Sequence, residues 1–122
     1  MSIPGSGVPV DRETSDALAA LAIGDTDFLG EAADMREQLR AGSSLDAKTF
    51  SLVKIGALVA LDAAPASYMW QVTAALDAGA TPQEILGVLT AVAPQTGMPR
   101  VVAAAPEIML ALGLDVPAEP GA

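Results

Sequence analysis

Three side chains with helical spacing, Ser67, Trp70 and Gln71, form the strongest candidate for a ligand site. Residues at i, i+3 and i+4 share one face of a helix, so these three could line a small pocket. The indole would supply a flat apolar wall, while the hydroxyl and the amide would hydrogen-bond a carbonyl or hydroxyl group. In an equally compatible interpretation, Trp70 packs in the core or an interface and the two polar groups bond to neighbouring backbone.

Two cationic residues are further candidates. Lys54 interrupts the apolar run LVKIGALVAL, and a desolvated lysine can act as a base or as a Schiff-base amine. We favour the simpler interpretation, in which Lys54 extends to a surface or pairs with an acid across an interface. Arg100 follows the break at Gly97 and could hold a substrate carboxylate or form a salt bridge between subunits. Tyr68 could also contact a ligand, although its different helix face favours packing.

The composition limits the chemistry of this chain. Its 122 residues include no Cys and no His, which excludes thiol redox chemistry, disulfides and the usual zinc ligands. A metal site would need oxygen ligands only, and we expect no cofactor. No Ser–His pair, glycine-rich phosphate loop or close carboxylate pair is evident, so the sequence gives no support to hydrolase, nucleotide-binding or glycosidase functions.

Charge and hydrophobicity define the expected partners. The net charge of −9 argues against nucleic acid, because phosphate binding needs a basic patch. Apolar residues make up 52% of the chain and aromatic residues only 3%, which favours closely packed helices. This apolar supply exceeds what a lone small domain usually buries, so we expect a homo-oligomer. Apolar runs such as Ile55–Leu61 are far shorter than the ~20 residues that span a bilayer, and the N-terminus lacks the pattern of a secretory signal. We therefore expect no membrane partner and a cytoplasmic location.

Helical patterns cover most of the chain, so the predicted fold class is all-α. Helices are expected over 16–23, 27–40, 46–63, 65–78, 81–93 and 99–112. They form one domain, 11–116, between disordered tails at 1–10 and 117–122. The clearest local pattern is Thr81-Pro82-Gln83-Glu84, a capping box with Pro in the first turn. Gly79 should end the helix before it, Pro94 should end the helix that follows, and Pro106 should bend the last helix.

The order of these features resembles the carboxymuconolactone decarboxylase and alkylhydroperoxidase D superfamily over about Leu45–Leu114. The resembling features are the long apolar helix, the aromatic-containing helix with Ala75 and Gly79 four and eight residues after Gln71, the Gly-Ala-Thr-Pro-x-Glu-Ile turn, and the Gly97-x-Pro99 break. The resemblance implies an oligomeric alkylhydroperoxidase D-like bundle of about six helices, with a trimer or hexamer as the expected assembly.

The residues that carry chemistry in this superfamily are replaced. Its thiol peroxidases have a Cys-x-x-Cys-x-x-x-His motif on the helix that corresponds to 65–78, with a proton-relaying Glu on the preceding helix. Here Ala64 and Ser67 stand at the Cys positions, Gln71 at the His position, and Ser51 or Leu52 at the Glu position. No residue can supply a thiolate, which excludes peroxide reduction by that route. Glutamine cannot act as a general acid near neutral pH, so ordinary carboxymuconolactone decarboxylation is not expected.

Two functions remain after these exclusions. The first is a cofactor-free enzyme of lyase or isomerase type, or a ligand binder, for a small carboxylate or carbonyl compound held between helices 46–63 and 65–78. Its candidate catalytic residues are Gln71, Ser67 and Lys54, and its candidate ligand contacts are Trp70, Tyr68, Arg100 and Ser51. The second is a non-catalytic oligomeric binding or scaffold protein whose side chains fill that space. A solvent-connected cavity lined by Trp70 and a cation would argue against the second function.

Overall fold

The protein is all-α, as the sequence predicts. A computed structural model describes residues 7–23 and 31–118, with side chains from Met35 onward in the second range. Its helices are α1 (Arg12–Ala22), α2 (Glu31–Gly42), α3 (Ala47–Leu61), α4 (Pro65–Asp77), α5 (Pro82–Thr96) and α6 (Met98–Ala111). No strand occurs within the described ranges, and no helix there is both long and apolar enough to cross a bilayer.

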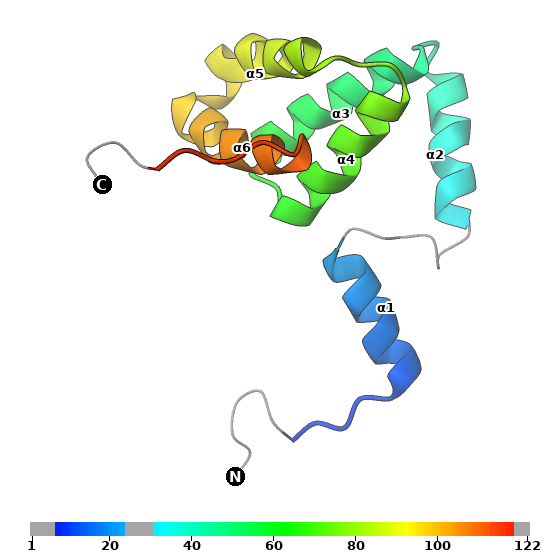
Figure 1. Cartoon of the computed structure of the whole chain (residues 1–122). Coiled ribbons are helices and arrows are strands. Elements are labelled where there is room, and N and C mark those ends of the chain that lie inside the picture. Colours follow the sequence, from blue (N-terminus) through cyan, green and yellow to red (C-terminus); the bar gives the residue numbers. More distant parts are fainter. Residues whose placement is uncertain (1–6, 24–30, 119–122) are drawn as a thin grey trace.

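Helices α3 to α6 pack around one apolar core (Figure 1). Helix α3 contacts all three of the others, as expected for the long apolar segment. The buried apolar residues are Ile55, Val59, Tyr68, Val72, Ala75, Ala80, Ile85, Leu89, Ala104 and Ile108. On α4, the buried residues Tyr68, Val72 and Ala75 recur at helical spacing, which turns one face of this helix toward the core.

The first two helices lie outside this core. Helix α1 buries none of its residues, and α2 stands beside the α3–α4 pair (Figure 1). The apolar side chains of Met35 and Leu39 on α2 are 59% and 60% exposed. The predicted start of this helix at residue 27 and the tail segments 1–6 and 119–122 lie outside the described residues.

Local hydrogen bonds fix the junction between α4 and α5. Gly79 has φ 95°, and the two N–H groups of Gly79 and Ala80 donate to the carbonyls of Leu76 and Ala75 at 3.0 and 2.9 Å, a Schellman ending. The capping box is also confirmed: the Thr81 N–H donates to Glu84 Oε1 at 3.0 Å, and the Glu84 N–H donates to Thr81 Oγ1 at 3.1 Å. The sequence therefore predicts this turn correctly from local chemistry alone.

Two predicted boundaries are wrong. Helix α5 continues through Pro94 to Thr96. Proline removes only one hydrogen bond from the helix, the bond to the carbonyl of Thr90, which is an exposed residue. The last turn is closed by the Gly97 N–H, which donates to the Ala93 carbonyl at 2.9 Å. Helix α1 begins one turn earlier than predicted, because Asp11 caps it by accepting from the Thr14 N–H at 3.2 Å.

We expect Thr81→Ala to lower the free energy of unfolding by about 1 kcal/mol, because the exposed α5 N-terminus loses its side-chain acceptor. Urea denaturation followed by circular dichroism measures this change. The matched control is Thr90→Ala, since Thr90 lies in the middle of the same helix and only bonds back to the Leu86 carbonyl. It should change stability by less than ~0.5 kcal/mol. Equal losses in the two variants would show that the capping box contributes nothing.

Candidate functional site

A cavity of about 540 Å³ lies between α2, α3 and α4 and opens to solvent. Three helices supply most of its lining, which consists of Ile23 after α1, Arg36, Glu37 and Arg40 from α2, Phe50, Ser51 and Lys54 from α3, and Met69, Trp70, Gln71, Thr73, Ala74 and Asp77 from α4. The sequence predicts a pocket between α3 and α4. It does not predict the contribution of α2.

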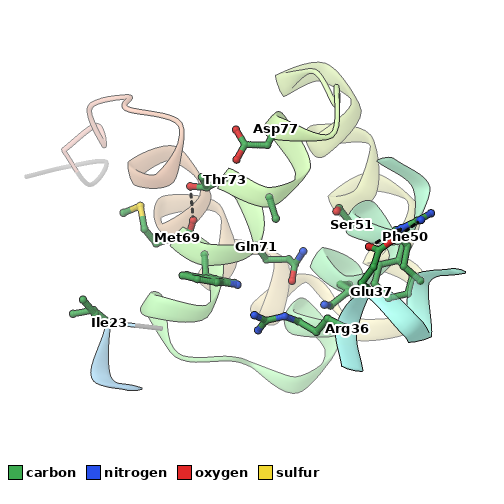
Figure 2. Close-up of a pocket in the computed structure, with 13 residues that line it drawn as sticks. Ile23, Arg36, Glu37, Phe50, Ser51, Met69, Gln71, Thr73 and Asp77 are labelled. Carbon is green, nitrogen blue, oxygen red and sulfur yellow. Dashed lines mark hydrogen bonds and ion pairs between the residues drawn. The ribbon is translucent and has the colours of Figure 1, made fainter. Parts of the chain in front are cut away.

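Two polar side chains in the lining, Ser51 and Gln71, are buried. They are 8% and 7% exposed. Neither side chain has a hydrogen-bond partner among the described residues. Every described side-chain nitrogen or oxygen that is sealed from solvent does have a partner, so the polar atoms of Ser51 and Gln71 are not sealed. Their polar atoms therefore reach the cavity. In Figure 2, Gln71 extends into the pocket toward Arg36, whereas Thr73 and Asp77 point away from Gln71.

Local structure explains why these two polar groups face the cavity. Gln71 lies one turn after Tyr68 and next to Val72, at the edge of the buried stripe of α4. Ser51 lies one turn before Ile55, a fully buried residue of α3. Each polar side chain thus lies at the border between the buried face of its helix and the face that lines the cavity. The arrangement offers a hydroxyl and an amide to a ligand from two different helices.

Lys54 brings an amine to the same cavity. Its Nζ lies 5.1 Å from the centre of the Phe50 ring, and the side chain is half-buried. Burial lowers the pKa of Lys54, and the positive charge of Arg36 lowers it further. No carboxylate among the described residues forms a salt bridge with Lys54. Within this chain, the lysine therefore neither pairs with a described acid nor extends fully into solvent.

Helix α2 places a second cation against the aromatic wall. The guanidinium carbon of Arg36 lies 5.6 Å from the centre of the Trp70 ring, a distance typical of a cation–π contact. Arg36 is not among the site residues predicted from the sequence. The spacing of Arg36 and Arg40 at i, i+4 would have indicated a cationic face on α2.

Positive charge is concentrated at this pocket. The lining holds three of the six basic residues of a chain whose net charge is −9, together with the acids Glu37 and Asp77. Arg40 Nη2 lies 2.7 Å from Glu37 Oε1 at the exposed rim, and this hydrogen bond lowers the pKa of Glu37. A small organic anion would find more cationic than acidic side chains among the described lining residues.

Three predicted site residues lie outside the cavity lining. Ser67, one turn before Gln71, is half-buried elsewhere on α4. Tyr68 is 2% exposed in the core, and burial raises its pKa, with smaller contributions from the charges of Asp62 and Glu107. Arg100 Nη1 donates to the Ala60 carbonyl at 2.9 Å, near the end of α3. Lys54, Ser51, Trp70 and Gln71 are the predicted site residues that the pocket brings together.

The residues present limit how a cofactor or metal could be held. Within the described ranges, no three side chains of His, Cys, Asp or Glu come together as a metal site would require. The cavity instead combines an aromatic wall, a hydroxyl, an amide and an amine. These groups can orient a carbonyl or carboxylate, and only the amine among them can act as a nucleophile at moderate pH.

Comparison with known proteins assigns the family. A model of the carboxymuconolactone decarboxylase family matches residues 26–108. Searches against curated proteins and solved structures give no significant match. The family match begins earlier in the chain than the predicted resemblance and includes α2, which contributes Arg36 to the pocket. Since the match covers most of the chain and the helical fold agrees with it, the chain belongs to the carboxymuconolactone decarboxylase family.

Proposed function

We propose that this protein binds a small carboxylate or carbonyl compound in the pocket between α2, α3 and α4, as a cofactor-free enzyme or a ligand binder. The observation that carries the proposal is the open cavity that combines Trp70 with the buried polar groups of Ser51 and Gln71 and with cationic side chains. Its volume of about 540 Å³ falls within the ~300–1,000 Å³ usual for small-molecule sites.

Each part of the lining suits one part of such a ligand. The Trp70 indole, covered on one side by Arg36, offers a flat surface to a planar apolar group. Ser51 and Gln71 can hydrogen-bond a carbonyl oxygen or a hydroxyl group, since neither has a described partner within the protein. Positive charge from Lys54 and the arginines favours a carboxylate.

The replaced family residues limit the reaction type. Gln71, at the position of the family's histidine, can orient a ligand but cannot exchange protons near neutral pH. Lys54 is the lining residue whose pKa is displaced toward neutrality. If the protein is an enzyme, we therefore assign proton transfer or nucleophilic attack to Lys54, in a reaction of lyase or isomerase type.

A structural role is the second candidate, and exposed apolar side chains favour an assembly. Helix α6 exposes Met98, Val102 and Leu110, and α1 buries none of its residues. We propose that these faces pack against further copies of the chain, in a trimer or hexamer. In a purely structural subunit, however, side chains should fill the site. The open cavity therefore argues against a role that is structural only.

We expect Gln71→Ala to weaken ligand binding about tenfold, because the loss of one ligand hydrogen bond costs ~1.4 kcal/mol. The chain has a single Trp, which lines the pocket, so its fluorescence reports binding. Benzoate, succinate and pyruvate serve as probes. The thermal midpoint should stay near that of the wild type, since the Gln71 amide has no described partner.

The matched control is Gln95→Ala, an exposed position on α5 outside the pocket, which should leave binding unchanged. If Gln71→Ala keeps the wild-type affinity and lowers the thermal midpoint, Gln71 is a structural residue.

Binding of benzoate should weaken as the pH rises through the lowered pKa of Lys54. The ammonium form of Lys54 attracts the anion, and its pKa lies below the ordinary lysine value because of burial and Arg36. Affinity should therefore be greatest below this lowered pKa and should fall as the pH rises through it. Lys54→Met should remove the transition, whereas Lys48→Met, which lies outside the pocket, should retain it. The same transition in both variants would assign it to another group.

A further inference from the structure

We propose that Lys54 is a nucleophilic amine that forms an imine with a small carbonyl compound carrying a carboxylate, such as a 2-oxo acid. The proposal rests on the proposed function, because it assigns a reaction to the same pocket. It narrows the ligand class from carboxylates or carbonyl compounds to molecules that carry both groups, and it names the atom that bonds to the ligand.

The position of Lys54 distinguishes it from the other lysine of the chain. Lys54 lines the cavity, is half-buried, and has no described carboxylate as a partner. Lys48 lies outside the cavity lining, with its Nζ 3.0 Å from Glu84 Oε2. The sequence contains no third lysine. The protein thus provides its own comparison between an amine in a pocket and an amine in a surface ion pair.

The surroundings of Lys54 favour the neutral amine that attack requires. Burial is the largest cause of its lowered pKa, and the charge of Arg36 on α2 acts in the same direction. The Phe50 ring acts in the opposite direction, since an aromatic face stabilises an ammonium group. The other charged side chains of the lining are Glu37 and Arg40, which pair with each other, and Asp77, which points away from Gln71 (Figure 2).

Imine formation proceeds in two balanced steps. The nitrogen lone pair of the neutral amine attacks the carbonyl carbon, a C–N bond forms, and the π electrons move to oxygen. The oxygen gains one proton and the nitrogen loses one, which gives a carbinolamine. The nitrogen lone pair then forms the C=N bond while the hydroxyl takes a proton from solvent and leaves as water, so the product is a protonated imine. Water enters through the open side of the cavity.

Neighbouring groups can orient the carbonyl compound for this attack. Ser51 lies one turn before Lys54 on α3, and Gln71 faces the cavity from α4. Their hydroxyl and amide N–H groups can donate to the oxygen as negative charge develops on it. Gln71 extends toward Arg36 (Figure 2), whose positive charge favours a carboxylate in that part of the pocket. A 2-oxo acid carries both groups on adjacent carbons.

Reductive trapping tests the proposal on the full chain. Pyruvate with sodium cyanoborohydride converts an imine to a stable secondary amine by hydride addition to its carbon. We expect one adduct per chain, mapped by peptide mass spectrometry to Lys54, with at least about tenfold less at Lys48. Lys54→Arg should abolish that adduct, because a guanidinium does not form an imine. Lys48→Arg should leave it intact.

The outcomes separate this inference from the proposed function. If pyruvate and benzoate change the Trp70 fluorescence but no adduct maps to Lys54, the pocket binds carboxylates and the imine is overturned. If neither probe binds and Lys48 and Lys54 are labelled equally, both proposals fail. Preferential labelling of Lys54 that excess benzoate suppresses supports both. The mapping on wild-type protein is decisive even if Lys54→Arg does not fold.

Discussion

The burial of α3 among α4, α5 and α6 is the constraint on which the rest of the molecule depends. Ile55 and Val59 are fully buried, and Gly56 lets α5 approach closely, because a Cβ there would lie 3.2 Å from Val92 Cγ1. The face of α3 that makes these contacts has little room for polar groups. Ser51 and Lys54 occupy the side that these contacts leave open, toward α2 and α4. Close packing on one side of α3 thus fixes where the pocket can form on the other.

The buried polar groups of the pocket need hydrogen-bond partners. A hydroxyl or amide taken out of water loses free energy unless a partner replaces the lost hydrogen bonds. Ser51 and Gln71 are almost fully buried and have no described partner within the chain, so water or a ligand in the cavity must satisfy them. A core residue selected only for packing would be apolar at either position. Both positions therefore suit the ligand contacts proposed for them, although Gln71 cannot titrate.

Local chemistry could be predicted from the sequence, and long-range placement could not. The capping box at Thr81 and the helix ending at Gly79 depend on residues a few positions apart, so the local sequence pattern is sufficient to predict them. The helical spacing of Trp70 and Gln71 likewise indicated one face. Arg100 is a candidate by its residue type and its place after Gly97, but its guanidinium donates to the carbonyl of a residue forty positions away. Arg36 enters the site only because α2 docks beside α4, which no local pattern specifies.

The negative charge of the whole chain and the cations of the pocket would act on an anionic ligand in opposite directions. A net charge of −9 opposes the approach of anions at long range, although salt screens charges beyond ~8–10 Å. Within the cavity, the cations of α2 and α3 are close and the low-dielectric walls strengthen their effect. Recognition of the proposed anion would therefore depend on short-range contacts rather than on long-range electrostatic steering. The position of α2 controls these contacts, because its arginines lie at the rim and over Trp70. If the proposed carboxylate binds near Arg36, its binding would also stabilise the position of α2 beside α4.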